Sequence, residues 1–248
     1  MLRNYSPYTL IILSFLSLIF VGTILLMMPF THISDKGFTF IEALFTATSA
    51  VTVTGLTICD VHSTFSVYGE VIVLLLIQLG GLGILTLSSV IILLISKKIS
   101  FYTKRLVSEG LNHEAKIDLY LHIKKVVFVV LLIEAIGAVL LFFVFIKEFP
   151  WHKALFYGIF HSVSAFCNAG ISLFPHNLEG YTFHIYMNII IALLIILGGL
   201  GFTSIIELFE YVTGKRRKIS VNSKFSMLIT LILLGVGTFL FFILEYHY

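Results

Sequence analysis

Five long runs of apolar residues limit what this chain of 248 residues can fold into. A helix needs about 20 apolar residues to cross a bilayer, and every run approaches or exceeds that length. Charged residues make up only 12% of the chain, about half of their share in soluble domains. Neither a soluble globular protein nor a disordered chain fits this composition. The sequence therefore predicts five membrane-spanning helices, at residues 8–28, 70–95, 126–146, 184–212 and 225–244.

The first run stands where a signal peptide would stand. It is preceded by a single charge, Arg3, it is longer than the apolar region of a signal peptide, and no small-residue cleavage site follows it. We therefore interpret it as a retained helix. Two further apolar segments, at residues 38–50 and 153–166, are too short to span, and they predict helices that enter the membrane without crossing it.

The basic residues predict the orientation of the chain. Of the 16 Lys and Arg residues, all except Lys36, Lys147 and Lys153 precede the first run, separate the second from the third, or separate the fourth from the fifth. Because basic loops stay in the cytoplasm, we expect a multi-pass protein of the cell membrane with a cytoplasmic N-terminus. The two short helices then enter from outside. The basic loops serve topology alone or also dock a partner, and both interpretations stay open.

A repeat underlies this order of helices. Residues 45–55 align with residues 160–170 at an offset of 115, sharing a Phe, a Ser-Ala pair and a Gly. Residues 79–83, Leu-Gly-Gly-Leu-Gly, recur unchanged at residues 197–201. Each copy reads as a span, a short helix, a Gly-containing loop and a second span. The predicted fold class is an all-α membrane protein of parallel helix–pore loop–helix repeats, related by rotation about the membrane normal.

The repeat divides the chain into two complete units and the first helix of a third. We expect the first unit at residues 1–98 and the second at residues 126–213. Basic cytoplasmic segments at residues 99–125 and 214–224 connect the units, and residues 225–248 form the first helix of the third. The glycines of the repeated Leu-Gly-Gly-Leu-Gly segment favour close helix packing over a hinge.

Each short helix runs into a loop that we expect to lie at membrane depth. The two loops consist of Thr52, Val53, Thr54 and Gly55, and of Cys167, Asn168, Ala169 and Gly170. Irregular backbone at that depth is tolerated where it is buried in protein or lines a water-filled cavity. The preceding helix ends with partial negative charge, and loop carbonyls can replace part of a cation's hydration shell. With a permissive Gly and no acidic side chain in either loop, the pattern favours passage of a dehydrated monovalent cation over an inert hairpin.

The sequence around these loops resembles the Ktr/Trk potassium transporter family. Residues 40–56 are similar to the first pore loop of that family, and in particular to that of the membrane subunit of the Ktr system. Residues 79–83, 133–138, 164–170 and 197–201 follow the family pattern in the same order, so the resemblance covers essentially the whole chain. It implies potassium uptake through a pathway enclosed by four helix–pore loop–helix units, in which the eight loop residues named above form part of the selectivity filter.

The resemblance also implies partners and ions. Proteins of this family form a membrane dimer docked on a cytosolic, nucleotide-binding regulatory ring. We therefore expect such a ring, a second copy or a missing second half, and the lipid bilayer as partners, and no nucleic acid. The expected transported ion is K⁺, with Na⁺ as an activating ion.

The sequence departs from the family pattern in two respects. Cys167 stands where a small polar residue or Asn is expected, which matters little if its carbonyl serves and more if its side chain does. The chain has two of four loops, and it lacks the gating segment of the third unit and the basic pore residue of the fourth. We therefore expect a fragment, a truncated reading frame or one half of a split protein. The alternative is a non-transporting half-subunit that only assembles with other membrane chains.

Some polar residues inside the predicted spans and short helices have a structural interpretation. Glu134 lies deep in the third run, where we favour a contact between helices over an ion site. Gln78 and Asn188 are expected to form hydrogen bonds across helices. Glu42 lies in the first turn of a short helix, where we expect it to cap the helix rather than attract ions.

Catalysis and metal binding fit the sequence poorly. Cys59, Asp60 and His62 suggest an intramembrane hydrolase, but they crowd on one loop with no visible group to orient a base. The nine His residues show no spacing typical of metal ligands on one helix face. We therefore expect no enzyme, and no metal site beyond the monovalent cation filter.

Overall fold

The computed structural model describes residues 7–33, 38–83 and 119–245. In these ranges every regular element is a helix, apart from one isolated bridge between His32 and Phe65. The long helices are α1 (Pro7–Leu26), α2 (Phe40–Thr52), α4 (Val67–Gly81), α7 (Leu119–Phe145), α8 (Trp151–Phe166), α9 (Ile185–Gly199), α10 (Phe202–Val212) and α11 (Val221–Glu245). The short ones are η2 (Pro29–Thr31), α3 (Val61–Thr64) and η3 (Glu179–Tyr181).

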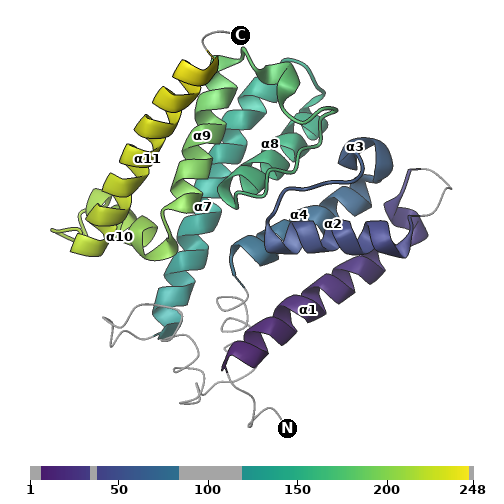
Figure 1. Cartoon of the computed structure of the whole chain (residues 1–248), viewed down its shortest axis with the longest axis horizontal. Coiled ribbons are helices and arrows are strands. Elements are labelled where there is room, and N and C mark those ends of the chain that lie inside the picture. The colour runs from purple at the N-terminus through teal and green to yellow at the C-terminus, as the bar shows by residue number, and fades with distance from the viewer. Residues whose placement is uncertain (1–6, 34–37, 84–118, 246–248) are drawn as a thin grey trace. The chain divides into compact units, whose positions relative to one another are not determined.

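The chain forms two compact units, residues 1–195 and 196–248. In the first unit, α1, α2 and α4 pack on one another, α7 packs on α8, and α4 also contacts α8 (Figure 1). The short helices α2 and α8 are well enclosed: six of the 13 residues of α2 are buried, and α8 is buried without a break from Phe160 to Phe166. The core of this unit therefore lies around the two short helices.

The short helix α2 begins at a capping box. The backbone N–H and the hydroxyl of Thr39 donate to Glu42 Oε2 at 2.8 and 2.7 Å, and the Glu42 N–H donates back to the Thr39 hydroxyl at 3.3 Å. These hydrogen bonds hold the pKa of the Glu42 carboxyl below its usual range. The predicted capping role of Glu42 is confirmed.

Aromatic rings and small residues join α8 to α7. Phe145 lies against Tyr157 and Phe174 in edge-to-face contacts, with ring centroids 6.4 and 5.4 Å apart. A methyl group on Gly158 would lie 2.7 Å from the Ala138 carbonyl oxygen, so the two helices pack backbone to backbone at this point. Close approach at small residues is the usual way in which helices pack in membranes.

The second unit contains α10 and α11, which pack on each other. Glu207 of α10 pairs with Arg216 at 3.0 Å and accepts a hydrogen bond from the Ser220 N–H at 2.9 Å. The Ser226 hydroxyl of α11 donates to the Leu200 carbonyl at 3.3 Å. These contacts connect the loop between the helices, and the start of α11, to the residues before and within α10.

The fourth run does not form one continuous helix, and that part of the prediction is wrong. It is divided between α9 and α10, and Gly201 between them has a φ of +84°. Such a conformation ends a right-handed helix and is readily available to Gly. The other copy of the segment behaves alike, since α4 ends at Gly81 and Gly83 has a φ of +73°. The repeated Leu-Gly-Gly-Leu-Gly segment therefore ends a helix in both copies.

Two described helices are long and apolar enough to cross a membrane by length and composition, at residues 124–145 and 221–245. The bent pair α9 and α10 makes a third if it is one span. In the regions of the first and second predicted spans, shorter apolar helices cover residues 12–26 and 67–81. The rest of the second predicted span, and most of the basic connector at residues 99–125, lie outside the described residues.

Replacing Gly158 by Ala tests the packing of α7 on α8. The added methyl group must push the two backbones apart, so we expect unfolding to become easier by about 1–3 kcal/mol. Thermal unfolding of the purified chain in detergent measures the effect. The control is Gly180→Ala, because nothing described lies within 4 Å of that position. Equal melting temperatures for both variants would contradict the packing described.

Candidate functional site

The first loop, residues 52–55, begins where α2 ends. Val53 has φ 56° and ψ 40°, the left-handed conformation, and Gly55 has a φ of +76°. The Thr54 N–H turns back to the Ser49 carbonyl at 3.0 Å. A left-handed Val is uncommon because its branched side chain crowds the backbone. The surrounding structure therefore holds this loop in a specific conformation.

The second loop, residues 167–170, follows the same path. Asn168 has a φ of 60°, Gly170 has a φ of +67°, and the Ala169 N–H donates to the Ser164 carbonyl at 2.8 Å. Each of these positions lies 115 residues after its counterpart in the first loop. The sequence alignment thus pairs residues that share both backbone conformation and hydrogen bonding.

The two loops meet at their glycines. A methyl group on Gly55 would overlap the Ala169 carbonyl, and one on Gly170 would lie 3.9 Å from the Gly55 Cα. A glycine is therefore required at position 55 for two reasons: the backbone has a positive φ there, and the neighbouring loop leaves no room for a side chain. The structure brings together loops that are more than a hundred residues apart in the sequence.

The loop side chains bond mostly to their own helices. The Thr52 hydroxyl donates to the Thr48 carbonyl at 2.7 Å, and the Thr54 hydroxyl donates to the Ser49 hydroxyl at 3.2 Å. The Asn168 amide donates to the Phe166 carbonyl at 3.3 Å. Thr52, Thr54 and Asn168 are nevertheless exposed, so both loops present backbone and polar groups at the surface of this unit.

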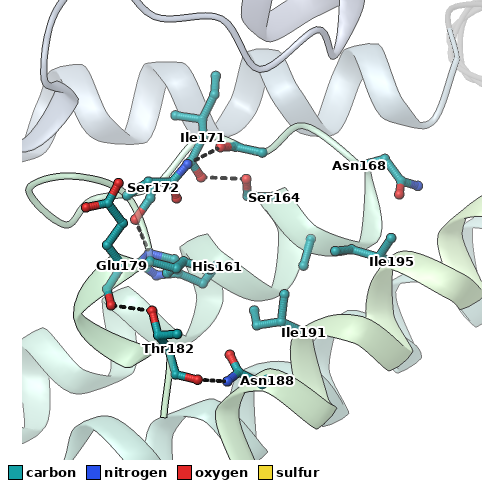
Figure 2. A pocket seen from close by; sticks show the side chains of 14 residues that line it. His161, Ser164, Asn168, Ile171, Ser172, Glu179, Thr182, Asn188, Ile191 and Ile195 are labelled. Atoms are coloured by element: carbon teal, nitrogen blue, oxygen red, sulfur yellow. Dashed lines mark hydrogen bonds between the residues drawn. The ribbon is translucent and has the colours of Figure 1, made fainter. Parts of the chain in front are cut away.

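Hydrogen bonds from three side chains hold the segment after Gly170. The Ser164 hydroxyl donates to the Ile171 carbonyl at 2.6 Å, and the Asn177 amide donates to the Gly170 carbonyl at 3.2 Å. The buried ring of His161 lies 3.0 Å from the Ser172 hydroxyl through Nε2, while Nδ1 donates to the Tyr157 carbonyl at 2.8 Å. Figure 2 shows His161, Ser164 and Ser172 in this arrangement.

Sequence reasoning missed these anchoring residues. His161 and Ser164 lie three residues apart on α8, so they share one helix face, and that spacing was the available signal. Nothing local marks Asn177, which reaches the loop from seven residues downstream.

An open pocket of about 670 Å³ lies beside the second loop. Its wall runs from the loop across the outer segment to α9, as Figure 2 shows for Asn168, Ser172, Thr182, Asn188 and Ile191. Asn188 donates to the Tyr181 and Thr182 carbonyls at 3.3 and 2.8 Å. The prediction that Asn188 bonds across helices is therefore wrong, because it caps the segment that leads into its own helix.

The first copy of the Leu-Gly-Gly-Leu-Gly segment supports both loops. A side chain on Gly80 would overlap the Val51 carbonyl, just before the first loop, and one on Gly81 would overlap the Cys167 side chain in the second. The interpretation of these glycines as packing residues is confirmed for this copy. Gly199, in the second copy, has no described atom within 4 Å beyond its own helix.

Glu134 connects α7 to α4 and to the second loop. Gln78 Nε2 donates to Glu134 Oε1 at 3.0 Å, and Cys167 Sγ lies 3.9 Å from the same oxygen. The predicted structural contact of Glu134, and the predicted cross-helix bond of Gln78, are both confirmed.

The three residues that suggested a hydrolase do not form a nucleophile–base pair. Asp60 accepts from the His62 N–H at 3.2 Å and caps α3, while the His62 ring pairs with Glu70 at 3.0 Å. Burial raises the pKa of the Cys59 thiol, which opposes the thiolate that a nucleophile requires. Within the described residues, no group of three His, Cys, Asp or Glu residues could hold a metal ion.

Comparison with known proteins identifies the family. Residues 2–246 match the family model TrkH, described as "Cation transport protein", and the chain belongs to this family. It is 37% identical to Ktr system potassium uptake protein B of Vibrio alginolyticus, over 96% of this chain and 52% of that protein. It is 38% identical to the protein of the same name of Bacillus subtilis, over 98% of this chain and 54% of the other.

A third relative is the potassium/sodium uptake protein NtpJ of Enterococcus hirae, which is 39% identical over 98% of this chain and 53% of its own length. The chain thus spans about half the length of these curated relatives.

Replacing Gly81 by Ala tests how the second loop packs on α4. The new methyl group overlaps Cys167, so we expect a loss of about 1–3 kcal/mol in unfolding free energy. Removing the colliding side chain, in Gly81→Ala with Cys167→Gly, should recover part of that loss. Thermal unfolding in detergent measures both, with Gly235→Ala as the control because nothing described lies within 4 Å there. If the double variant is no more stable than Gly81→Ala, Cys167 is not what Gly81 accommodates.

Proposed function

We propose that this chain forms half of a pathway through which a cell takes up K⁺. The observation that carries the proposal is the pair of loops, which share one backbone conformation and meet at Gly55 and Gly170. Residues 1–98 and 126–213 would be two helix–pore loop–helix units, and residues 225–248 would begin a third. The basic segments at residues 99–125 and 214–224 would connect them in the cytoplasm.

The geometry suits the passage of a cation because each loop turns a backbone N–H donor back to its own helix. The Thr54 and Ala169 N–H groups bond to serine carbonyls of the preceding helices, so these donors do not face a cation in front of the loops. The negative ends of the α2 and α8 dipoles lie next to the two loops, which meet at Gly55 and Gly170. Carbonyl oxygens can then take over part of the ion's hydration shell.

The proposed filter comprises both loops. Its residues are Thr52, Val53, Thr54, Gly55, Cys167, Asn168, Ala169 and Gly170. The Cys167 side chain is engaged behind the loop by Gly81 and Glu134, so its carbonyl is the group that we assign to the filter.

K⁺ is the ion that we assign, with Na⁺ as an activating ion. Two relatives are named potassium uptake proteins, and the third is named a potassium/sodium uptake protein. Neither loop has a carboxylate, and carbonyl-lined filters act on monovalent cations that shed water. We propose transport without enzyme chemistry, consistent with the engagement of Asp60 and His62 in helix capping and ion pairing.

The proposed setting is the cell membrane, with the N-terminus in the cytoplasm. The exposed loop between α10 and α11 has four consecutive basic residues, 215–218, of which Arg216 pairs with Glu207. Such a loop stays on the cytoplasmic side and can meet a cytosolic nucleotide-binding regulatory ring. A second copy or a separate second half would complete the pathway, and nucleic acid is not a proposed partner.

The second candidate is a half-subunit that assembles with other membrane chains but does not transport alone. This candidate fits the coverage of the comparisons, in which the chain spans about half the length of its relatives. Rubidium uptake into liposomes containing the purified chain separates the candidates. Uptake supports a self-assembled pathway, whereas no uptake beside stable association with full-length subunits supports the half-subunit. Reading the coding sequence beyond Tyr248 shows which protein the cell makes.

The filter assignment predicts the effect of Gly55→Ser in the complete coding sequence. A side chain at this position opposes the positive φ and overlaps the Ala169 carbonyl. We expect the ratio of K⁺ to Na⁺ uptake to fall by about tenfold, the effect of about 1.4 kcal/mol in relative ion binding. Uptake by cells that lack their own K⁺ transporters measures the ratio, with Gly180→Ser as the control. An unchanged ratio at normal abundance would remove Gly55 from the filter.

A further inference from the structure

Glu134 is a charged residue type in the middle of an apolar helix, and it is almost fully enclosed. Its exposed fraction is 4%, and the apolar segment around it covers residues 124–145. Placing a carboxyl group there is costly, so its partners indicate what it does. Among the described residues, its side chain bonds to Gln78 and Cys167, and no basic residue is paired with it.

The three side chains come from three different parts of the first compact unit. Gln78 belongs to α4, Glu134 to α7, and Cys167 to the second loop. The Gln78 amide and the Cys167 thiol converge on one oxygen, Glu134 Oε1, at 3.0 and 3.9 Å. Gly81, three residues after Gln78, leaves the space that the Cys167 side chain fills.

The backbone of the same residue holds the end of α8. The Ser162 hydroxyl donates to the Glu134 backbone carbonyl at 2.7 Å. Ser162 lies on α8, five residues before Cys167. The Ser164, His161 and Asn177 side chains hold the far end of the second loop at Gly170, Ile171 and Ser172. Glu134 is therefore placed to hold the other end of the loop, at Cys167, so that both ends of the loop are fixed.

Among the residues that the structure describes, the first loop has no equivalent of this contact. The residue 115 positions before Glu134 is Ile19, whose side chain has no atom that can accept a hydrogen bond. In the first loop the near end packs on Gly80 through the Val51 carbonyl instead. The polar contact is thus specific to the place where α4 of one proposed unit meets the loop of the next.

We propose that Glu134 is a positioning residue of the second loop, which it fixes to α4 through Gln78 and Cys167 and so sets the ion preference of the pathway. The role requires a hydrogen-bond acceptor at this position rather than a negative charge. Glu134→Gln keeps an acceptor oxygen of the same reach, whereas Glu134→Met keeps the length and removes the acceptor. This inference rests on the proposed function only for its second readout.

The first readout is the reactivity of Cys167 in the purified chain. The chain has two cysteines, so Cys59→Ser leaves Cys167 as its single thiol. In this background we expect Glu134→Met and Gln78→Met each to speed alkylation of Cys167 by N-ethylmaleimide by about tenfold, the size of one lost hydrogen bond. Glu134→Gln should react at the parent rate. Glu70→Gln is the matched control, because Glu70 is equally buried but bonds to His62.

The second readout is the ratio of K⁺ to Na⁺ uptake by the complete coding sequence. We expect Glu134→Met and Gln78→Met to lower the ratio, while Glu134→Gln and Glu70→Gln leave it unchanged. A merely structural contact would lower abundance in the membrane without moving the ratio.

Three results would overturn the proposal. Alkylation rates that are the same in all variants would show that Glu134 does not hold Cys167. Loss of ion preference in Glu134→Gln equal to that in Glu134→Met would assign the role to the charge. Faster alkylation in the Met variants with an unchanged uptake ratio would show that the contact does not set ion preference. Absence of uptake in the parent protein would instead reject the proposed function, while the alkylation rates still decide whether Glu134 positions the loop.

Discussion

Backbone N–H groups just after the end of a buried helix must find hydrogen-bond acceptors, and this requirement shapes both loops. The Thr54 and Ala169 N–H groups find them by turning back to Ser49 and Ser164, which forces the preceding Val53 and Asn168 into the left-handed region. The turned chain then needs a positive φ at Gly55 and Gly170. Because these two donors face the helices, they do not compete for a cation with the loop carbonyl oxygens, of which the Gly170 carbonyl already accepts from Asn177. The proposed function depends on this arrangement.

Small residues and one buried polar contact keep the loops in place. Gly80 and Gly81 let α4 approach both loops, and Gly158 lets α8 approach α7. Where the packing surfaces are so close, adding a single methyl group must displace a neighbouring backbone or, at Gly81, the Cys167 side chain. The hydrogen bond between Gln78 and Glu134 adds a directional contact between α4 and α7 to this packing. The fold therefore aligns two loops whose sequences share few residues.

Much of this arrangement could be predicted from the sequence. The lengths of the apolar segments indicated the short helices α2 and α8, and the alignment at an offset of 115 paired loop residues that share a backbone conformation. The break between α9 and α10 was missed because hydropathy does not register a change of φ at Gly201. His161 was missed although it shares a face of α8 with Ser164. Asn177 was missed and Asn188 misassigned because their partners depend on how the outer segment folds back, which no local pattern encodes. Periodicity and length thus predict elements, while side-chain partners require the tertiary structure.

The most direct test is an experimental map of the complete protein in Tl⁺, a K⁺ substitute that scatters X-rays anomalously. The account predicts an anomalous peak coordinated by backbone carbonyls of both loops, beside the point where Gly55 and Gly170 meet. A map with ordered loops and no peak between their carbonyls, or with the ion held elsewhere by side chains, would contradict it.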